Sequence, residues 1–153
     1  MGDVNWISLL LAALVPLVMG FVWYHKALFG KTWMAETGIT EEMAKSANMG
    51  KTFIISFIMA ALLGFFLINF NNSPGQEGVY DTFKHGAAHG AILGVFVAMP
   101  LFITNGLFEL RSLKHMLINL GYWIVTMAIM GGIVDAMNHF PNEMEALKDA
   151  AGM

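Results

Sequence analysis

TFIISFIMAALLGFFLINF, residues 52–70, is an unbroken apolar stretch without a charged side chain. An α-helix rises about 1.5 Å per residue, so about 20 apolar residues cross the hydrocarbon core of a bilayer, which is about 30 Å thick. Three further stretches of this kind occupy residues 6–24, 87–108 and 116–137, and Asp135 is the only charged residue in the four. The sequence therefore predicts an all-α fold, a four-helix transmembrane bundle.

The composition agrees with a membrane protein. Apolar residues make up 57% of the 153 residues and charged residues only 12%, whereas soluble domains contain about 25% charged residues. The four apolar stretches leave little room for another unit, so we predict a single integral membrane domain over residues 1–153. Nucleic-acid binding is not expected because the chain has no basic stripe. There is no cysteine, which excludes disulfide and thiolate chemistry.

The links between the apolar stretches differ in basic residues. The first and third links hold six of the eight Lys and Arg residues, and Lys84 and Lys148 lie in the second link and the C-terminal segment. The six are Lys26, Lys31, Lys45, Lys51, Arg111 and Lys114. Because cytoplasmic loops collect Lys and Arg, we predict that these two links are cytoplasmic and that both termini lie on the outer side.

The first link also carries a helix signal of its own. Thr40 is a suitable N-cap, and Glu41 and Glu42 follow it as acidic residues of a first turn. We predict a short interfacial helix at residues 41–49, on the cytoplasmic surface.

Small residues recur at four-residue spacing in the third apolar stretch and the segment before it. Gly86, Gly90 and Gly94 form this stripe, and Gly132 belongs to a similar one in the fourth stretch. In lipid, helices associate through close backbone approach and polar contacts rather than through apolar burial. We favour contacts within one bundle, and the alternative interpretation is a homo-oligomer built on the glycine stripe.

Polar residues gather at the predicted outer ends of the third and fourth spans. His85 and His89 are four residues apart, as are Asp135 and His139, so each pair shares a helix face. Antiparallel neighbours would bring Asp135 beside His89 and His139 beside His85. Such side chains suit zinc or another transition metal. A hydrogen-bonded network, a proton relay and, more weakly, a haem site held by two histidines are the alternatives.

A second polar group marks the predicted inner ends of the same spans. Asn105 and Asn119 each lie about one turn inside the span, so we predict a hydrogen bond between them across the helix pair. Glu109 and Arg111 lie at the membrane boundary, where surface ion pairs contribute little. No nucleophile with an adjacent base and no Gly-rich phosphate loop is found, so no catalytic residue is predicted.

Several short stretches in both halves of the chain resemble one family. They are Trp23-Tyr24, Phe29-Gly30-Lys31-Thr32-Trp33-Met34, Gly38-Ile39-Thr40-Glu41-Glu42, Asn105-Gly106-Leu107-Phe108-Glu109, Arg111-Ser112-Leu113-Lys114 and Ile118-Asn119-Leu120-Gly121-Tyr122. Together they resemble the domain of unknown function 1761 family. The resemblance implies a small four-span protein of a bacterial inner membrane, and it implies no activity or cofactor.

Two functional interpretations follow from these residues. The first is a non-enzymatic accessory or scaffold protein that self-associates or joins a larger complex in the lipid bilayer. The alternative is a small transporter or a metal- or proton-handling protein that uses His85, His89, Asp135 and His139.

The predicted orientation can be tested with reporter fusions. A fusion at Gly38 should report a cytoplasmic location and a fusion at Met153 an external one, because the basic residues favour the cytoplasmic side for the first link. A cytoplasmic signal from the fusion at Met153 would overturn the orientation and leave the number of spans unchanged.

Overall fold

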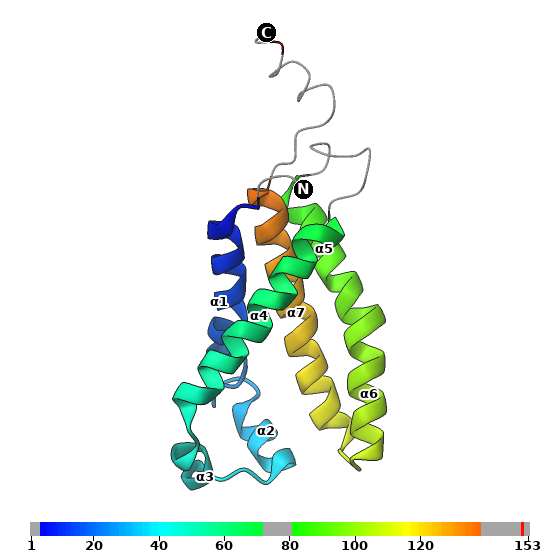
Figure 1. Cartoon of the computed structure of the whole chain (residues 1–153). Helices are drawn as coiled ribbons and strands as arrows, with labels where there is room; N and C mark the ends of the chain where they lie inside the picture. The colour runs from blue at the N-terminus through cyan, green and yellow to red at the C-terminus, as the bar shows by residue number, and fades with distance from the viewer. Residues whose placement is uncertain (1–3, 72–80, 139–150, 152–153) are drawn as a thin grey trace.

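The computed structural model describes residues 4–71, 81–138 and 151, and those residues contain helices and no β-strand (Figure 1). Four helices are long and apolar enough to cross a membrane, which confirms the predicted all-α fold with four spans. The spans are α1 (Trp6–Trp23), α4 (Met49–Asn71), the continuous helix Phe83–Phe108 and α7 (Leu113–Met137). The third span comprises α5 (Phe83–Leu93), a π-helical turn (Gly94–Ala98) and α6 (Met99–Phe108).

Polar caps lengthen three of the spans at their N-termini. The side chains of Asn48, Thr82 and Ser112 each accept a backbone N–H from the first turn of α4, α5 and α7. The first N–H groups of a helix have no partner within it, so such caps allow the helix to begin before the apolar stretch. These spans therefore start about one turn earlier than predicted.

The first link contains two short helices, of which the sequence predicted one. The predicted interfacial helix is α3 (Glu41–Ser46), and Thr40 caps it as expected. It is shorter than the predicted segment because Ala47 is extended and α4 already begins at Met49. The other helix, α2 (Gly30–Thr37), ends at Gly38, whose φ of 71° lies in the left-handed region that favours glycine.

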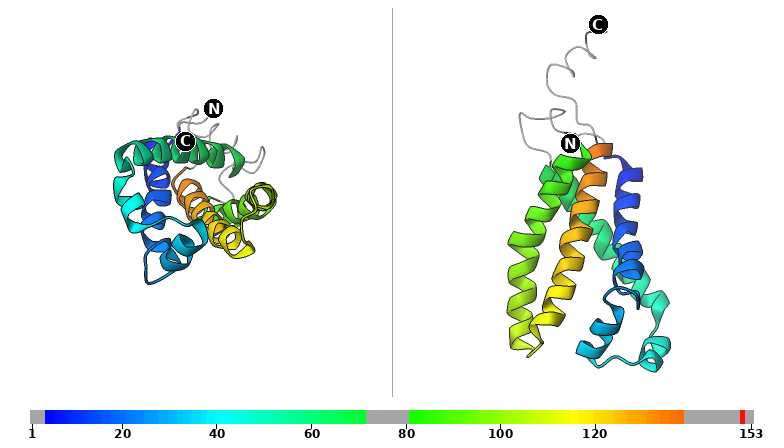
Figure 2. Two further views of the ribbon diagram at one scale, coloured as in Figure 1. Left: turned by 90° about the horizontal axis from the view of Figure 1, so that it is seen from below. Right: turned by 180° about the vertical axis from the view of Figure 1, so that it is seen from behind.

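Helix α7 lies in the middle of the bundle. Viewed along the bundle, α1 and the third span lie on opposite sides of α7, and α4 crosses one face of the bundle from α1 to the third span (Figure 2). Half of the most apolar window of α7 is buried, against 22% for each of the other three spans. Leu67, Met130 and Val134 form the centre of the core.

The two ends of the bundle are named as follows. The terminal end is the end at which α1 begins and α7 ends. The loop end is the opposite end, which contains α2, α3 and the α6–α7 turn.

The π-helical turn lies just before Pro100. The backbone N–H of Met99 donates to the carbonyl of Gly94, five residues earlier, in place of the usual four. Proline has no N–H to donate and clashes with the preceding turn of a regular helix. A π-helical turn next to it provides a local adjustment of the hydrogen-bond ladder.

The glycine stripe of α5 brings its backbone against α7. A methyl group on Gly86 would lie 2.2 Å from the carbonyl oxygen of Gly131, and one on Gly90 would lie 2.0 Å from that of Met127. One on Gly94 would lie 2.9 Å from Ile124 Cα. These surfaces are occupied within the chain, so the stripe makes contacts inside the bundle rather than the homo-oligomer that was the alternative.

Gly132, predicted to serve helix packing from the α7 side, contacts a side chain rather than a backbone. A methyl group there would lie 2.6 Å from the ring of Phe83. It therefore makes room for the first residue of α5 at the terminal end.

The close contact at Gly90 gives a stability prediction. Gly90→Ala should lower the free energy of unfolding by roughly 1–3 kcal/mol, the usual cost of overpacking, because the new methyl group meets backbone. Gly50→Ala is the matched control, since the nearest atom to its new methyl group would be Asn48 Oδ1 at 3.6 Å. Unfolding in mixed detergent micelles, followed by circular dichroism, measures both. Equal stability of the two variants would contradict the assigned α5–α7 contact.

Candidate functional site

A hydrogen-bonded pair of side chains, His85 and Asp135, joins α5 and α7 at the terminal end. His85 Nδ1 is 2.9 Å from Asp135 Oδ2, and the Asp135 side chain is buried whereas that of His85 is partly exposed. The sequence had predicted His89 as the partner of Asp135. That prediction is wrong, because the partner is His85, one helical turn before His89. The cause is the glycine contact, because Gly86 packs against Gly131 and Asp135 and so places His85 beside the carboxylate.

His89 lies next to this hydrogen-bonded pair without a hydrogen bond to Asp135. Its ring centroid is 4.2 Å from that of His85 and 5.5 Å from that of Phe70 on α4. Its Nδ1 atom is enclosed and has no hydrogen-bond partner among the described residues. We call His85, His89 and Asp135 the terminal-end cluster.

The three described members of the predicted metal site are not grouped as metal ligands by themselves. In the described part of the chain, no three His, Asp or Glu side chains are grouped as metal ligands. His139, the fourth predicted ligand, lies outside the described residues. The four-residue metal site therefore stays a prediction.

Asparagines at the same end join the start of α1 to the end of α7. Asn138 is buried; its amide donates to Ser8 Oγ at 2.6 Å, and its amide oxygen accepts the backbone N–H of Asn5 at 2.8 Å. The Asn5 amide in turn donates to the carbonyl of Met137 at 2.8 Å. The sequence analysis did not predict this contact. The sequence feature that could have indicated it is the asparagine just outside each span, Asn5 before α1 and Asn138 after α7.

At the loop end, Asn119 connects α7 with the end of α1. Its amide oxygen accepts the Tyr24 hydroxyl at 2.9 Å, and its amide nitrogen donates to His115 Nε2 at 3.1 Å. Nearby, Trp23 Nε1 donates to the carbonyl of Ile118 at 3.0 Å. The predicted hydrogen bond between Asn105 and Asn119 is therefore wrong, because Asn119 directs its amide to α1 and to its own helix.

The first link is attached to the same end of α7. The Trp33 ring packs against Tyr24 with centroids 5.2 Å apart. The Ser112 hydroxyl donates to the Glu36 carboxylate, and Lys114 Nζ lies 3.9 Å from that carboxylate. These contacts fix α2 against the start of α7.

Helix α3 is joined to the end of α1 by an exposed ion pair. The Lys26 ammonium contacts the Glu41 carboxylate and lowers the pKa of that carboxyl group by hydrogen bonding and charge. Exposed pairs contribute little to stability, so this contact positions the link rather than holding the fold.

A cavity of about 220 Å³ lies between α6 and α7 at the loop end. Its lining combines polar and apolar side chains. The lining residues are Phe102, Asn105, Gly106, Glu109, Arg111, His115, Met116 and Asn119. Asn105, Glu109, Arg111 and Asn119 were the inner polar residues predicted from the sequence, whereas Phe102, Gly106 and Met116 were missed because they carry no polar group.

The charged residues of this cavity lie at its exposed side. Arg111 Nε is 3.3 Å from Glu109 Oε2, and both side chains are substantially exposed, as expected for a surface pair at the boundary. His115 Nδ1 is enclosed without a hydrogen-bond partner among the described residues. This arrangement suits binding of a small charged group, since it pairs a cation and an anion with amide and imidazole groups.

Four apolar spans, with α7 between the other three and most interhelical polar contacts near the two ends, define a small multi-pass membrane protein. The family model described as "Protein of unknown function (DUF1761)" matches residues 7–134, so the chain belongs to this family. The match begins in α1 and ends in the last turn of α7, so it includes all four spans. No curated protein matches the chain, and no solved structure does.

The corrected histidine pairing can be measured with a double-mutant cycle. His85→Phe and Asp135→Leu should show a coupling energy of about 1–3 kcal/mol in unfolding experiments, because each single change leaves the other partner of a half-buried pair alone. His89→Phe combined with Asp135→Leu is the matched control and should show a smaller coupling, because His89 forms no hydrogen bond with Asp135. A larger coupling for His89 than for His85 would restore the pairing that the sequence predicted.

Proposed function

We propose that this chain is a non-enzymatic accessory or scaffold subunit of a bacterial inner-membrane complex, which it joins by self-association or by binding another membrane protein. The uneven packing of the third span supports this role. Helix α5 packs closely on α7, whereas α6 contacts mainly α7 and the preceding π-helical turn, and α4 contacts the span mainly at α5. One flank of α6 thus has no helix beside it within the described residues.

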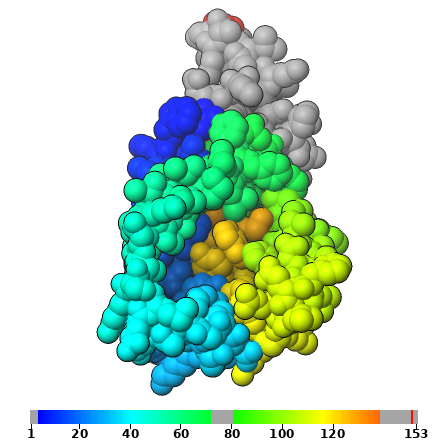
Figure 3. Space-filling model, turned by 60° about the horizontal axis from the view of Figure 1, so that its bottom comes forward, coloured from blue at the N-terminus to red at the C-terminus, as the bar shows by residue number. Residues whose placement is uncertain are grey.

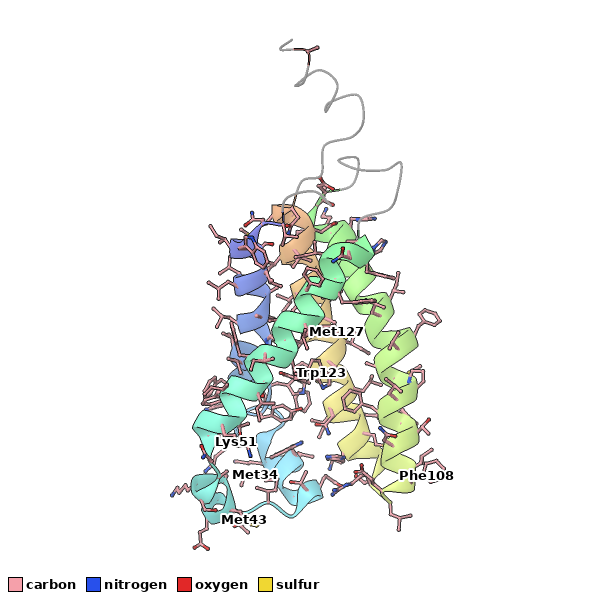
Figure 4. All side chains as sticks on the ribbon, in the orientation of Figure 1. Met34, Met43, Lys51, Phe108, Trp123 and Met127 are labelled. Carbon is pink, nitrogen blue, oxygen red and sulfur yellow. The ribbon has the colours of Figure 1, made fainter. Side chains whose placement is uncertain are left out.

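A hollow marks this uneven packing on the surface. Viewed toward the loop end, the molecule is hollowed between α4 and α6, with α1 and α7 at the base (Figure 3). Trp123 and Met127 of α7 lie between α4 and α6 (Figure 4). In a membrane, helices associate through close packing and polar contacts. The hollow is a concave surface against which a helix of another subunit could pack closely.

The distribution of basic residues supports the proposed orientation. Helices α2 and α3 and the α6–α7 turn lie at one end of the bundle (Figure 1), and the six basic residues of the first and third links belong to that end. The start of α1 and the end of α7 meet at the opposite end. We therefore place the loop end in the cytoplasm and both termini outside.

Proton or metal handling is the second candidate function. The observation that favours it is the terminal-end cluster, in which the buried Asp135 carboxylate pairs with one imidazole and a second imidazole lies beside it. Ionisable groups at membrane depth often serve transport. This role needs no partner protein, so it predicts activity from the purified chain in vesicles.

Photo-crosslinking in native membranes tests the scaffold role. A photoreactive residue at Leu101, which is 60% exposed on α6, should form a discrete protein adduct that co-purifies with the chain at fixed stoichiometry. An adduct of twice the mass indicates self-association, and another mass indicates a different subunit. Leu10 on α1, 51% exposed, is the matched control and should react with lipid alone. Lipid adducts alone from Leu101 would contradict the proposal.

A further inference from the structure

The cavity between α6 and α7 carries an inference that does not depend on the scaffold role. We propose that it binds the phosphoethanolamine headgroup of a membrane phospholipid. The cavity lies where α6 ends and α7 begins, beside the turn of Glu109, Leu110 and Arg111. That position is at the level where lipid headgroups meet a membrane-spanning helix.

The α6–α7 turn fixes the two charged residues of the cavity. The backbone N–H of Arg111 donates to the carbonyl of Gly106 at 2.8 Å, and that of Leu110 donates to Leu107 at 3.2 Å. This pair of bonds is the Schellman motif that commonly ends helices. Leu110 has a φ of 55°, a left-handed conformation that usually calls for glycine. The turn therefore keeps Glu109 and Arg111 together despite a local conformational cost.

The polar lining matches the two charges of a phosphorylated amine. One bond joins Arg111 Nε to Glu109, and the terminal guanidinium nitrogens have no hydrogen-bond partner among the described residues. Guanidinium groups bind phosphate oxygens through parallel N–H donors. The second carboxylate oxygen of Glu109 can accept an N–H of a primary ammonium group. Asn105 and His115 add an amide and an imidazole to the same wall.

The surroundings favour a lipid over a soluble ligand. Phe108 is 87% exposed and Leu110 is 93% exposed, and Leu107 and Leu113 are also exposed near the same turn. Phe108 extends outward from the lower end of α6 (Figure 4). These side chains provide an apolar path for acyl chains directly beside the polar cavity, and Phe102 and Met116 provide apolar walls inside it.

The amine is the feature that selects among phospholipids. Phosphatidylcholine carries a quaternary ammonium without N–H donors, so it cannot hydrogen-bond to Glu109. Phosphatidylglycerol lacks the positive charge, which leaves the Glu109 carboxylate facing an anionic headgroup. Among these three headgroups, only the one with a primary amine can form charge-assisted hydrogen bonds at both ends.

Native mass spectrometry of the full chain in detergent tests this assignment. The protein is titrated with dioctanoyl phosphatidylethanolamine, phosphatidylcholine and phosphatidylglycerol, and with soluble glycerophosphoethanolamine. We expect the first lipid to bind about 10-fold more tightly than the other two, the size expected for one charge-assisted hydrogen bond. Arg111→Gln should weaken its binding about 10-fold for the same reason. Glu109→Gln should abolish the preference over phosphatidylglycerol.

Two further variants distinguish binding in the cavity from attraction of the lipid to the positive charge of the whole loop end. Lys51→Gln removes a positive charge from the loop end away from the cavity, on the opposite side from Phe108 (Figure 4), and should leave binding unchanged. Gly106→Ala keeps every charge, but its methyl group would lie 2.3 Å from Met116 Sδ and should displace that side chain and weaken binding.

Three outcomes would overturn the lipid assignment. Equal or tighter binding of phosphatidylglycerol would show that no amine is recognised. Equal binding of glycerophosphoethanolamine would assign the cavity to a soluble phosphorylated amine. Equal losses in Lys51→Gln and Arg111→Gln would show attraction to the whole surface rather than to the cavity.

Discussion

The backbone contact between α5 and α7 is the constraint on which the rest of the structure depends. Lipid tails are as apolar as leucine, so two helices in a membrane gain little from covering apolar side chains. At Gly90 the distance from an added methyl group to a carbonyl oxygen of α7 would be only 2.0 Å, which no other residue type permits without movement. This contact fixes the rotation of both helices. That rotation places His85, rather than His89, beside Asp135.

The sequence predicted the features that depend on composition along one helix, and it missed those that depend on helix rotation. Long apolar stretches were enough to find four spans, and Thr40 was enough to find the start of α3. Helix α2 was missed because it is short and mostly polar, and contacts of Glu36 with the start of α7 hold it. Likewise, the position of Asn119 in the sequence predicts how deep in the membrane the residue lies. It does not predict that its side chain points toward Tyr24.

At both ends of the bundle, hydrogen bonds that involve side chains hold α1 against α7. At the terminal end, asparagine side chains cap exposed backbone groups of both helices. At the loop end, the indole of Trp23 and the hydroxyl of Tyr24 each reach a polar atom of α7. Bonds at both ends prevent α1 from rotating or sliding. In the described residues, α6 has no comparable bond to α1 or α4, so the third span is fixed mainly through α5.

Because the third span is fixed mainly through α5, α6 has both an uncovered flank and a cavity at its end. The stretches that carry the family resemblance come from distant parts of the chain, yet Trp23, Trp33, Asn105 and Asn119 all lie in the loop-end half of the bundle. A headgroup held between Glu109 and Arg111 would place its acyl chains along α6. The lipid would then form part of the surface that a partner helix meets, so the partner would recognise α6 and its bound lipid together.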